Sequence, residues 1–197
     1  MKTDVIVISS NGNEIEKALE QTEKVASYKE LSKKDANNLR LLAEEMMGMM
    51  RAITGEREGM FWIEDEDDVY ELHLRVTTLM TQDKREELIK ASKSGKNEAA
   101  RSLMGRLIEL FDLGVDVQSS SMFYSSIISE CNSPMQDTLA WTLSAYHNNL
   151  MQNIDKNEEA RELWDELEKS VVAHLADDVK VYVRSNVAEM TIIKKLG

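Results

Sequence analysis

Two regions of the chain alternate apolar and polar residues, as strands with one buried face do. Every second residue is apolar in 69–76, and valines alternate with Lys180 and Tyr182 in 179–183. A turn at 185–186 and an apolar run at 188–193 follow, so the chain is expected to close as an antiparallel hairpin. Apolar runs at 5–8 and 60–63 predict two further strands. The acidic run 64–68 is predicted to be the loop of a hairpin between 60–63 and 69–76.

Other segments repeat apolar residues every three or four positions, which indicates helices. The first is expected to begin at Asn13, with Ile15, Leu19, Thr22 and Ala26 on one face. A second is expected to open at Ser32–Asp35 and to end at Gly55. Further helices are predicted at 83–91, 98–111, 137–151 and from about 158 to 175, whereas 112–134 show no clear pattern.

This order of elements predicts an α+β fold, a two-layer sandwich with a mixed, mostly antiparallel sheet and helices on one face. The 197 residues suit one domain, 1–197, in which about 95–155 form a helical insertion or lid. A chain of this length buries about 70% of its unfolded surface on folding.

Charge and cysteine content narrow the function classes. The net charge of −12 repels phosphate backbones and anionic lipids, so neither nucleic acid nor a membrane surface is an expected partner. Cys131 is the only cysteine, which excludes an internal disulfide and a cysteine-based zinc site. The run 5–8 is too short to span a membrane, and the protein is expected to be cytoplasmic.

Catalytic motifs are absent from the sequence. It has no Walker loop, no dinucleotide glycine fingerprint, and no acid, base and nucleophile that converge. His73, His147 and His174 are far apart in sequence, with none at metal-ligand spacing of another. His73 is predicted to be solvated on the outer face of its strand, and His174 to complement a helix dipole. The run 64–68 lacks the glycine and spacing of an EF-hand, so a turn is favoured over a calcium site.

Two features leave alternatives open. Gly95 and Lys96, within 94–97, could form a phosphate-binding loop, but an ordinary loop between helices explains the same residues. Four methionines crowd one helix at positions 46, 47, 49 and 50. Methionine fills irregular cores and also makes adaptable binding surfaces. Together the four cover more than half of the helix circumference, so at least one is expected to face something other than the sheet.

The segment Leu31-Ser32, followed by Leu39-Arg40-Leu41-Leu42-Ala43-Glu44-Glu45-Met46-Met47, resembles the second helix of the histidine-kinase-like ATPase superfamily. The nearest branch is the anti-sigma-factor kinases, small bacterial regulators. That branch also opens with a strand, a helix and this helix. It ends with a helix that feeds an antiparallel pair, as 166–179 and 189–192 do here. The resemblance covers most of the chain outside about 112–155.

In that superfamily a glutamate on this helix activates water, and an asparagine one turn later binds magnesium. The resemblance assigns the glutamate to Glu45 and places Met49 where the asparagine stands. A thioether is a poor ligand for magnesium, which demands hard oxygens.

The adenine-reading motif, an aspartate with glycines, corresponds to 77–80, where Thr78 could still accept one hydrogen bond. The glycine-rich lid corresponds loosely to four residues: Gly95, Lys96, Asn97 and Gly105.

The resemblance therefore implies a degenerate nucleotide-binding regulator that binds ATP or ADP, without magnesium, and acts on a protein partner by binding rather than by turnover. Glu45 is the candidate base for any residual catalysis, and the alternative is a helix carboxylate paired with a nearby base or with solvent. A second hypothesis is an interaction module on the same scaffold that binds no nucleotide, favoured if Met49 and Met80 fill the pocket. A third is that the resemblance is accidental. The sequence does not decide whether two copies associate.

Overall fold

The computed structural model describes residues 1–9, 13–54, 58–77, 138–156, 158–184 and 187–197. Within these ranges the strands are β1 (Ile6–Ser9), β2 (Glu58–Glu66), β3 (Val69–Thr77), β4 (Thr138–Thr142), β5 (Asp178–Arg184) and β6 (Val187–Lys195). The helices are α1 (Asn13–Tyr28), α2 (Lys33–Thr54), α6 (Leu143–Asn153), α7 (Glu158–Leu167) and α8 (Val171–Leu175).

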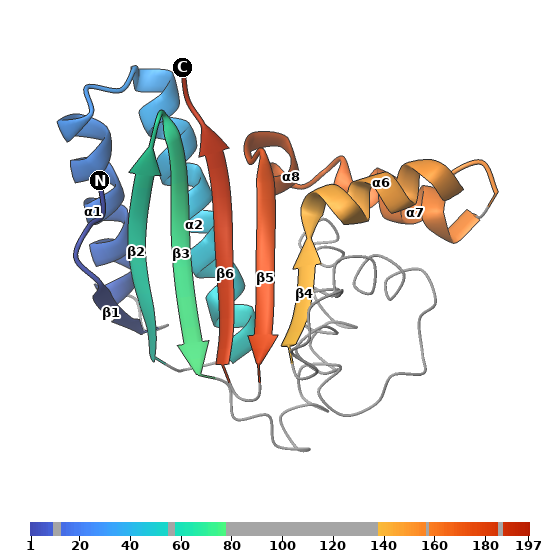
Figure 1. Ribbon diagram of the computed structural model, residues 1–197, viewed down its shortest axis with the longest axis horizontal. Coiled ribbons are helices and arrows are strands. Elements are labelled where there is room, and N and C mark those ends of the chain that lie inside the picture. The colour runs from blue at the N-terminus through green and yellow to red at the C-terminus, as the bar shows by residue number, and fades with distance from the viewer. Residues whose placement is uncertain (10–12, 55–57, 78–137, 157, 185–186) are drawn as a thin grey trace.

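The strands form one six-stranded sheet in the order β1-β2-β3-β6-β5-β4 (Figure 1). Every pairing between these described strands is antiparallel. The predicted α+β class with a largely antiparallel sheet is confirmed, as are the two hairpins β2–β3 and β5–β6. The middle of the sheet is the pairing of β3 with β6, in which Leu72 lies opposite Ile192 and His73 opposite Thr191.

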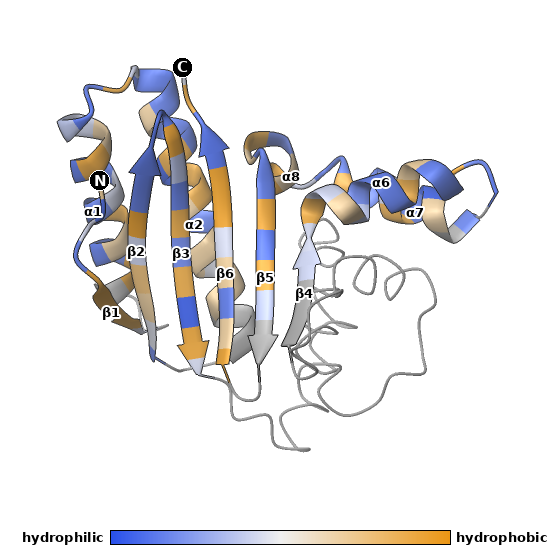
Figure 2. Cartoon of the chain, in the orientation of Figure 1, coloured by the Kyte–Doolittle hydropathy of each residue, from blue (hydrophilic) through white to orange (hydrophobic). Residues whose placement is uncertain are grey.

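Helices α1 and α2 cover one face of the sheet (Figure 1). The alternation along β3 explains this arrangement, because Tyr70, Leu72, Leu74 and Val76 are buried on the helix side. Figure 2 shows the alternation as apolar and polar bands along the strand. Helices α6 and α7 extend from the edge strand β4, away from the sheet (Figure 1).

Helix α2 begins where the sequence predicts it. The Ser32 hydroxyl accepts a hydrogen bond from the Asp35 amide at 3.2 Å and donates one to the Asp35 carboxylate at 2.6 Å. Met46, Met47, Met49 and Met50 are all buried, each at most 4% exposed. They are accommodated because α2 contacts not only β3 and β6 but also α1 and α8. The methionines therefore fill the core between several elements.

The structure corrects the predicted secondary structure at 64–68, at 137–151 and at 158–175. The acidic run is mostly strand, because β2 continues to Glu66, and only Asp67 and Asp68 make the turn, with φ of 47° and 62°. Such positive φ values at both residues are those of a tight two-residue hairpin turn. The predicted helix 137–151 begins as strand β4, because Trp141 pairs with Val181 and is buried.

The predicted helix 158–175 is two helices. Its break lies at Ser170, whose hydroxyl accepts a hydrogen bond from the Ala173 amide at 3.3 Å and so caps α8. His174 lies in the last turn of α8, as expected. The predicted helices 83–91 and 98–111 lie outside the described residues, as does 95–137 of the helical insertion or lid predicted at about 95–155. Its remaining residues form β4 and α6.

His73 is on the outer face of β3 but is not solvated, contrary to the prediction. His73 is only 8% exposed, because its ring stacks on that of Trp62 of β2. The two ring centroids are 4.8 Å apart and the planes are 4° from parallel. Its Nδ1 is hydrogen-bonded to the Thr191 hydroxyl at 3.1 Å. A cross-strand aromatic neighbour therefore buries a side chain that the alternation assigns to solvent.

This burial makes stability depend on pH. Burial lowers the pKa of His73. The carboxylates of Glu64, Glu71 and Glu189 act against this shift, and the ammonium group of Lys2 adds to it. Between the lowered folded pKa and the unfolded value of about 6.5, the unfolded chain binds more protons. The free energy of unfolding is therefore expected to fall as the pH drops through that window, and to fall less in His73→Gln. Urea unfolding at steps from pH 7.5 to 5 measures both slopes.

A second variant tests how far the charge of Glu71 raises the pKa of His73. Glu71, whose carboxylate oxygen lies 3.4 Å from Nε2 of His73, raises the pKa of His73. Glu71→Gln is expected to lower the folded pKa further and so to steepen the loss of stability in acid. Equal slopes for the wild type and His73→Gln would contradict the prediction.

Candidate functional site

The structure places two of the sequence-predicted site residues. Glu45 and Met49 lie one helical turn apart on α2. Thr78, Gly95, Lys96, Asn97 and Gly105, together with Met80, lie outside the described residues. The adenine contact predicted for Thr78 and the predicted lid therefore stay predictions.

Glu45 is on an exposed flank of α2. Arg40, five residues earlier and so about 140° around the helix, pairs with Glu23 of α1, so the Glu45 flank faces away from α1. Partial loss of hydration and, after it, the neighbouring Glu44 raise the pKa of Glu45. Within the described part of the chain no ion pair joins Glu45 to a base. The exposed carboxylate therefore fits the alternative of a helix residue that faces solvent as well as it fits the role of a base.

Met49 projects into the core beside Glu45. It is 4% exposed and belongs to the same cluster as Met46 and Met50. The position that follows the glutamate by one turn therefore offers a buried sulfur and no oxygen. A magnesium ion could not exchange its water ligands for this side chain.

The C-terminal half of α2 lies directly on the end of β3. Gly59 of β2 pairs with Val76 of β3, and a Cβ built on Gly59 would lie 2.9 Å from Val76 Cγ1 and 3.0 Å from Met50 Sδ. The turn of α2 that holds Met49 and Met50 is thus packed against the last residues of β3. The predicted neighbourhood of the Glu45 helix and the strand that leads to Thr78 exists in the fold.

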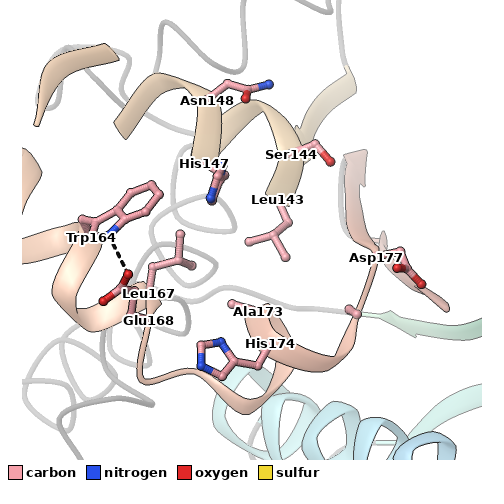
Figure 3. A pocket seen from close by; sticks show the side chains of 11 residues that line it. Leu143, Ser144, His147, Asn148, Trp164, Leu167, Glu168, Ala173, His174 and Asp177 are labelled. Carbon is pink, nitrogen blue, oxygen red and sulfur yellow. Dashed lines mark hydrogen bonds between the residues drawn. The ribbon is translucent and has the colours of Figure 1, made fainter. Parts of the chain in front are cut away.

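A second feature was not predicted from the sequence. Residues of α6, α7 and α8, together with Ala176 and Asp177 just before β5, line an open cavity of about 540 Å³ (Figure 3). Its residues include His147 and Trp164, whose rings are 4.7 Å apart, and Glu168. Ala173 and His174 of α8 join this lining after the chain breaks at Ser170, and the sequence predicts one continuous helix across that break.

The described residues include neither a group of metal ligands nor a helix that could span a membrane. Among the described residues no three or more histidine, cysteine, aspartate or glutamate side chains are grouped so as to hold a metal ion. None of the helices in those ranges is both long and apolar enough to cross a membrane. Comparisons with protein-family models, with curated proteins and with solved structures find no match.

Proposed function

We propose that the protein is a nucleotide-binding regulator of the histidine-kinase-like ATPase type, which binds ATP or ADP and acts on a protein partner without magnesium-dependent turnover. One observation carries the proposal. The flank of α2 that bears Glu45 is exposed, and Met50 of the same helix lies beside Gly59 of β2, whose partner Val76 is near the end of β3. This is where the resemblance expects a nucleotide to lie between the two elements.

The absence of turnover follows from Met49. A glutamate with a raised pKa is a competent general base. Transfer of a phosphoryl group, however, relies on metal ions that neutralise the developing charge. With a buried thioether in place of an oxygen ligand, Glu45 has no metal partner from α2. Binding is therefore favoured over hydrolysis.

A second candidate, an interaction module without nucleotide, is favoured by the same side chain. Met49 fills space next to Glu45, as it would if the pocket were closed. The outer face of the sheet also exposes apolar side chains, with Val7 at 54%, Met60 at 48% and Tyr182 at 42%. A protein partner could cover them.

Calorimetric titration with ATP and with ADP, each with and without magnesium, tests the proposal. A micromolar dissociation constant that magnesium leaves unchanged is the expected result. Glu45→Gln, Thr78→Leu and Lys96→Ala are expected to weaken binding. Glu16→Gln on α1, an exposed carboxylate away from this flank, is the matched control.

Other outcomes lead elsewhere. No heat and no thermal shift at millimolar nucleotide would overturn the nucleotide proposal and favour the interaction module. Steady release of phosphate that requires magnesium would show that turnover survives, against the role given to Met49.

A further inference from the structure

The cavity between α6, α7 and α8 has an apolar base and an aromatic wall. Leu143 and Leu167 point toward its centre, as do the rings of His147 and Trp164 (Figure 3). The two rings are tilted by 48° with centroids 4.7 Å apart. A volume of about 540 Å³ lies within the range of small-molecule sites, about 300–1,000 Å³.

The charge of this lining is negative. Glu168 and Asp177 contribute carboxylates, and among the described residues the lining includes no lysine or arginine. The C-terminal end of α7, which carries the negative end of the helix dipole, also lies here at Leu167. Together with the net charge of −12, this lining disfavours phosphates and favours a cation.

Glu168 is the better placed of the two carboxylates. Asp177 is already engaged, because its Oδ2 accepts the Lys195 amide at 2.6 Å and lies 3.4 Å from the Lys194 ammonium. Oε1 of Glu168 accepts the Trp164 indole N–H at 3.0 Å, which holds the carboxylate beside the ring. The carboxylate therefore lies at the edge of the indole ring, where it can pair with an organic cation that packs on the ring face.

We propose that this cavity binds a small organic cation with a flat or apolar body, such as an amidinium or guanidinium compound. The apolar body would pack on Leu143 and Leu167, and its charged end would pair with Glu168 beside Trp164. The proposal is independent of the nucleotide site, since the described residues that line the cavity come from α6, α7, α8 and the segments that follow α7 and α8, and not from α2.

Titration of the full chain with benzamidine, followed by calorimetry and by the amide and indole resonances of α7, tests this proposal. Saturable binding that shifts the Trp164 indole signal is the expected result. Glu168→Gln, which keeps an acceptor for the indole, is expected to weaken binding by about tenfold or more. Benzamide, the neutral analogue, is expected not to bind.

Glu162→Gln, on the same helix but outside the cavity, is the matched control and should bind as the wild type does. The proposal is overturned if benzamidine does not saturate, if Glu168→Gln binds equally well, or if Glu162→Gln loses as much affinity. Thermal unfolding of each variant identifies any that fails to fold. Trp164→Phe then serves as the second test of the aromatic wall of the cavity. Saturating ATP should leave the affinity for benzamidine unchanged, so this test and the nucleotide test can fail separately.

Discussion

Replacing Gly59 with alanine is expected to lower the free energy of unfolding by about 1–3 kcal/mol. The added Cβ would lie 2.9 Å from Val76 Cγ1, 3.0 Å from Met50 Sδ and 3.3 Å from the Arg75 carbonyl oxygen. The methionine can move, but the carbonyl belongs to the neighbouring strand and is fixed by the pairing of β2 with β3. For a chain of this size the loss corresponds to about 2–4 °C in Tm for each kcal/mol.

Gly48 provides the matched control. It lies within α2, and a Cβ there would meet nothing within 4 Å. Gly48→Ala is therefore expected to raise stability by about 0.5–1 kcal/mol, because alanine loses less backbone entropy in a helix. Urea and thermal unfolding measure both changes. Effects of the same sign at the two glycines would contradict the close packing of α2 on β2.

Replacing Met49 with asparagine is expected to make nucleotide binding depend on magnesium. The proposed function gives Met49 the position at which proteins of the histidine-kinase-like ATPase superfamily hold the ion through an asparagine oxygen. Supplying that oxygen should let magnesium strengthen ATP binding by about tenfold, a typical coupling between two ligands. Titration with ATP at fixed magnesium concentrations measures the coupling, and the wild type should show none.

The same replacement carries a cost in stability. Met49 is 4% exposed, and a buried carboxamide without partners costs about 1–3 kcal/mol. Met49→Leu, which conserves volume, should cost less and leave binding independent of magnesium. If Met49→Asn folds, binds ATP and shows no response to magnesium, Met49 does not stand where the resemblance puts it.

Much of the fold could be predicted from local pattern. The alternation in β3 and β5 reports one buried face directly, and the cap at Ser32 and the 3.6-residue period fix α2. The order β1-β2-β3-β6-β5-β4 could not be predicted beyond its two hairpins. The pairing of β3 with β6 joins residues that no local signal connects.

The errors have a common physical origin in tertiary contacts. The residues of β4 fit a helical period as well as a strand, and pairing with β5 decides between them. His73 is buried rather than solvated because its ring stacks on Trp62, its cross-strand partner on β2. Glu64 and Asp65 lie in β2 because β3 pairs with them, although their charge is typical of loops.

Part of the candidate site could be predicted from the sequence and part could not. That Glu45 and Met49 lie one turn apart on α2 follows from their spacing, whereas the exposure of one and the burial of the other depend on what packs around the helix. The cavity bounded by Trp164 and Glu168 could not be predicted, because it depends on how three helices are arranged after the break at Ser170. The packing of α8 on α2 likewise could not be predicted, because it joins elements from distant parts of the chain.

The central pairing of β3 with β6 has a consequence for how the chain folds. Strands β1 to β3 with α1 and α2 come from one half of the sequence, and β4 to β6 with α6 to α8 come from the other. The halves meet along a seam where His73 and Thr191, bonded to each other, are 118 residues apart. Closing so long a loop costs entropy before the seam contributes any stability, so joining the two halves is expected to limit the folding rate. Until then each half exposes an unpaired strand edge, and those are the surfaces at which newly made chains would associate wrongly.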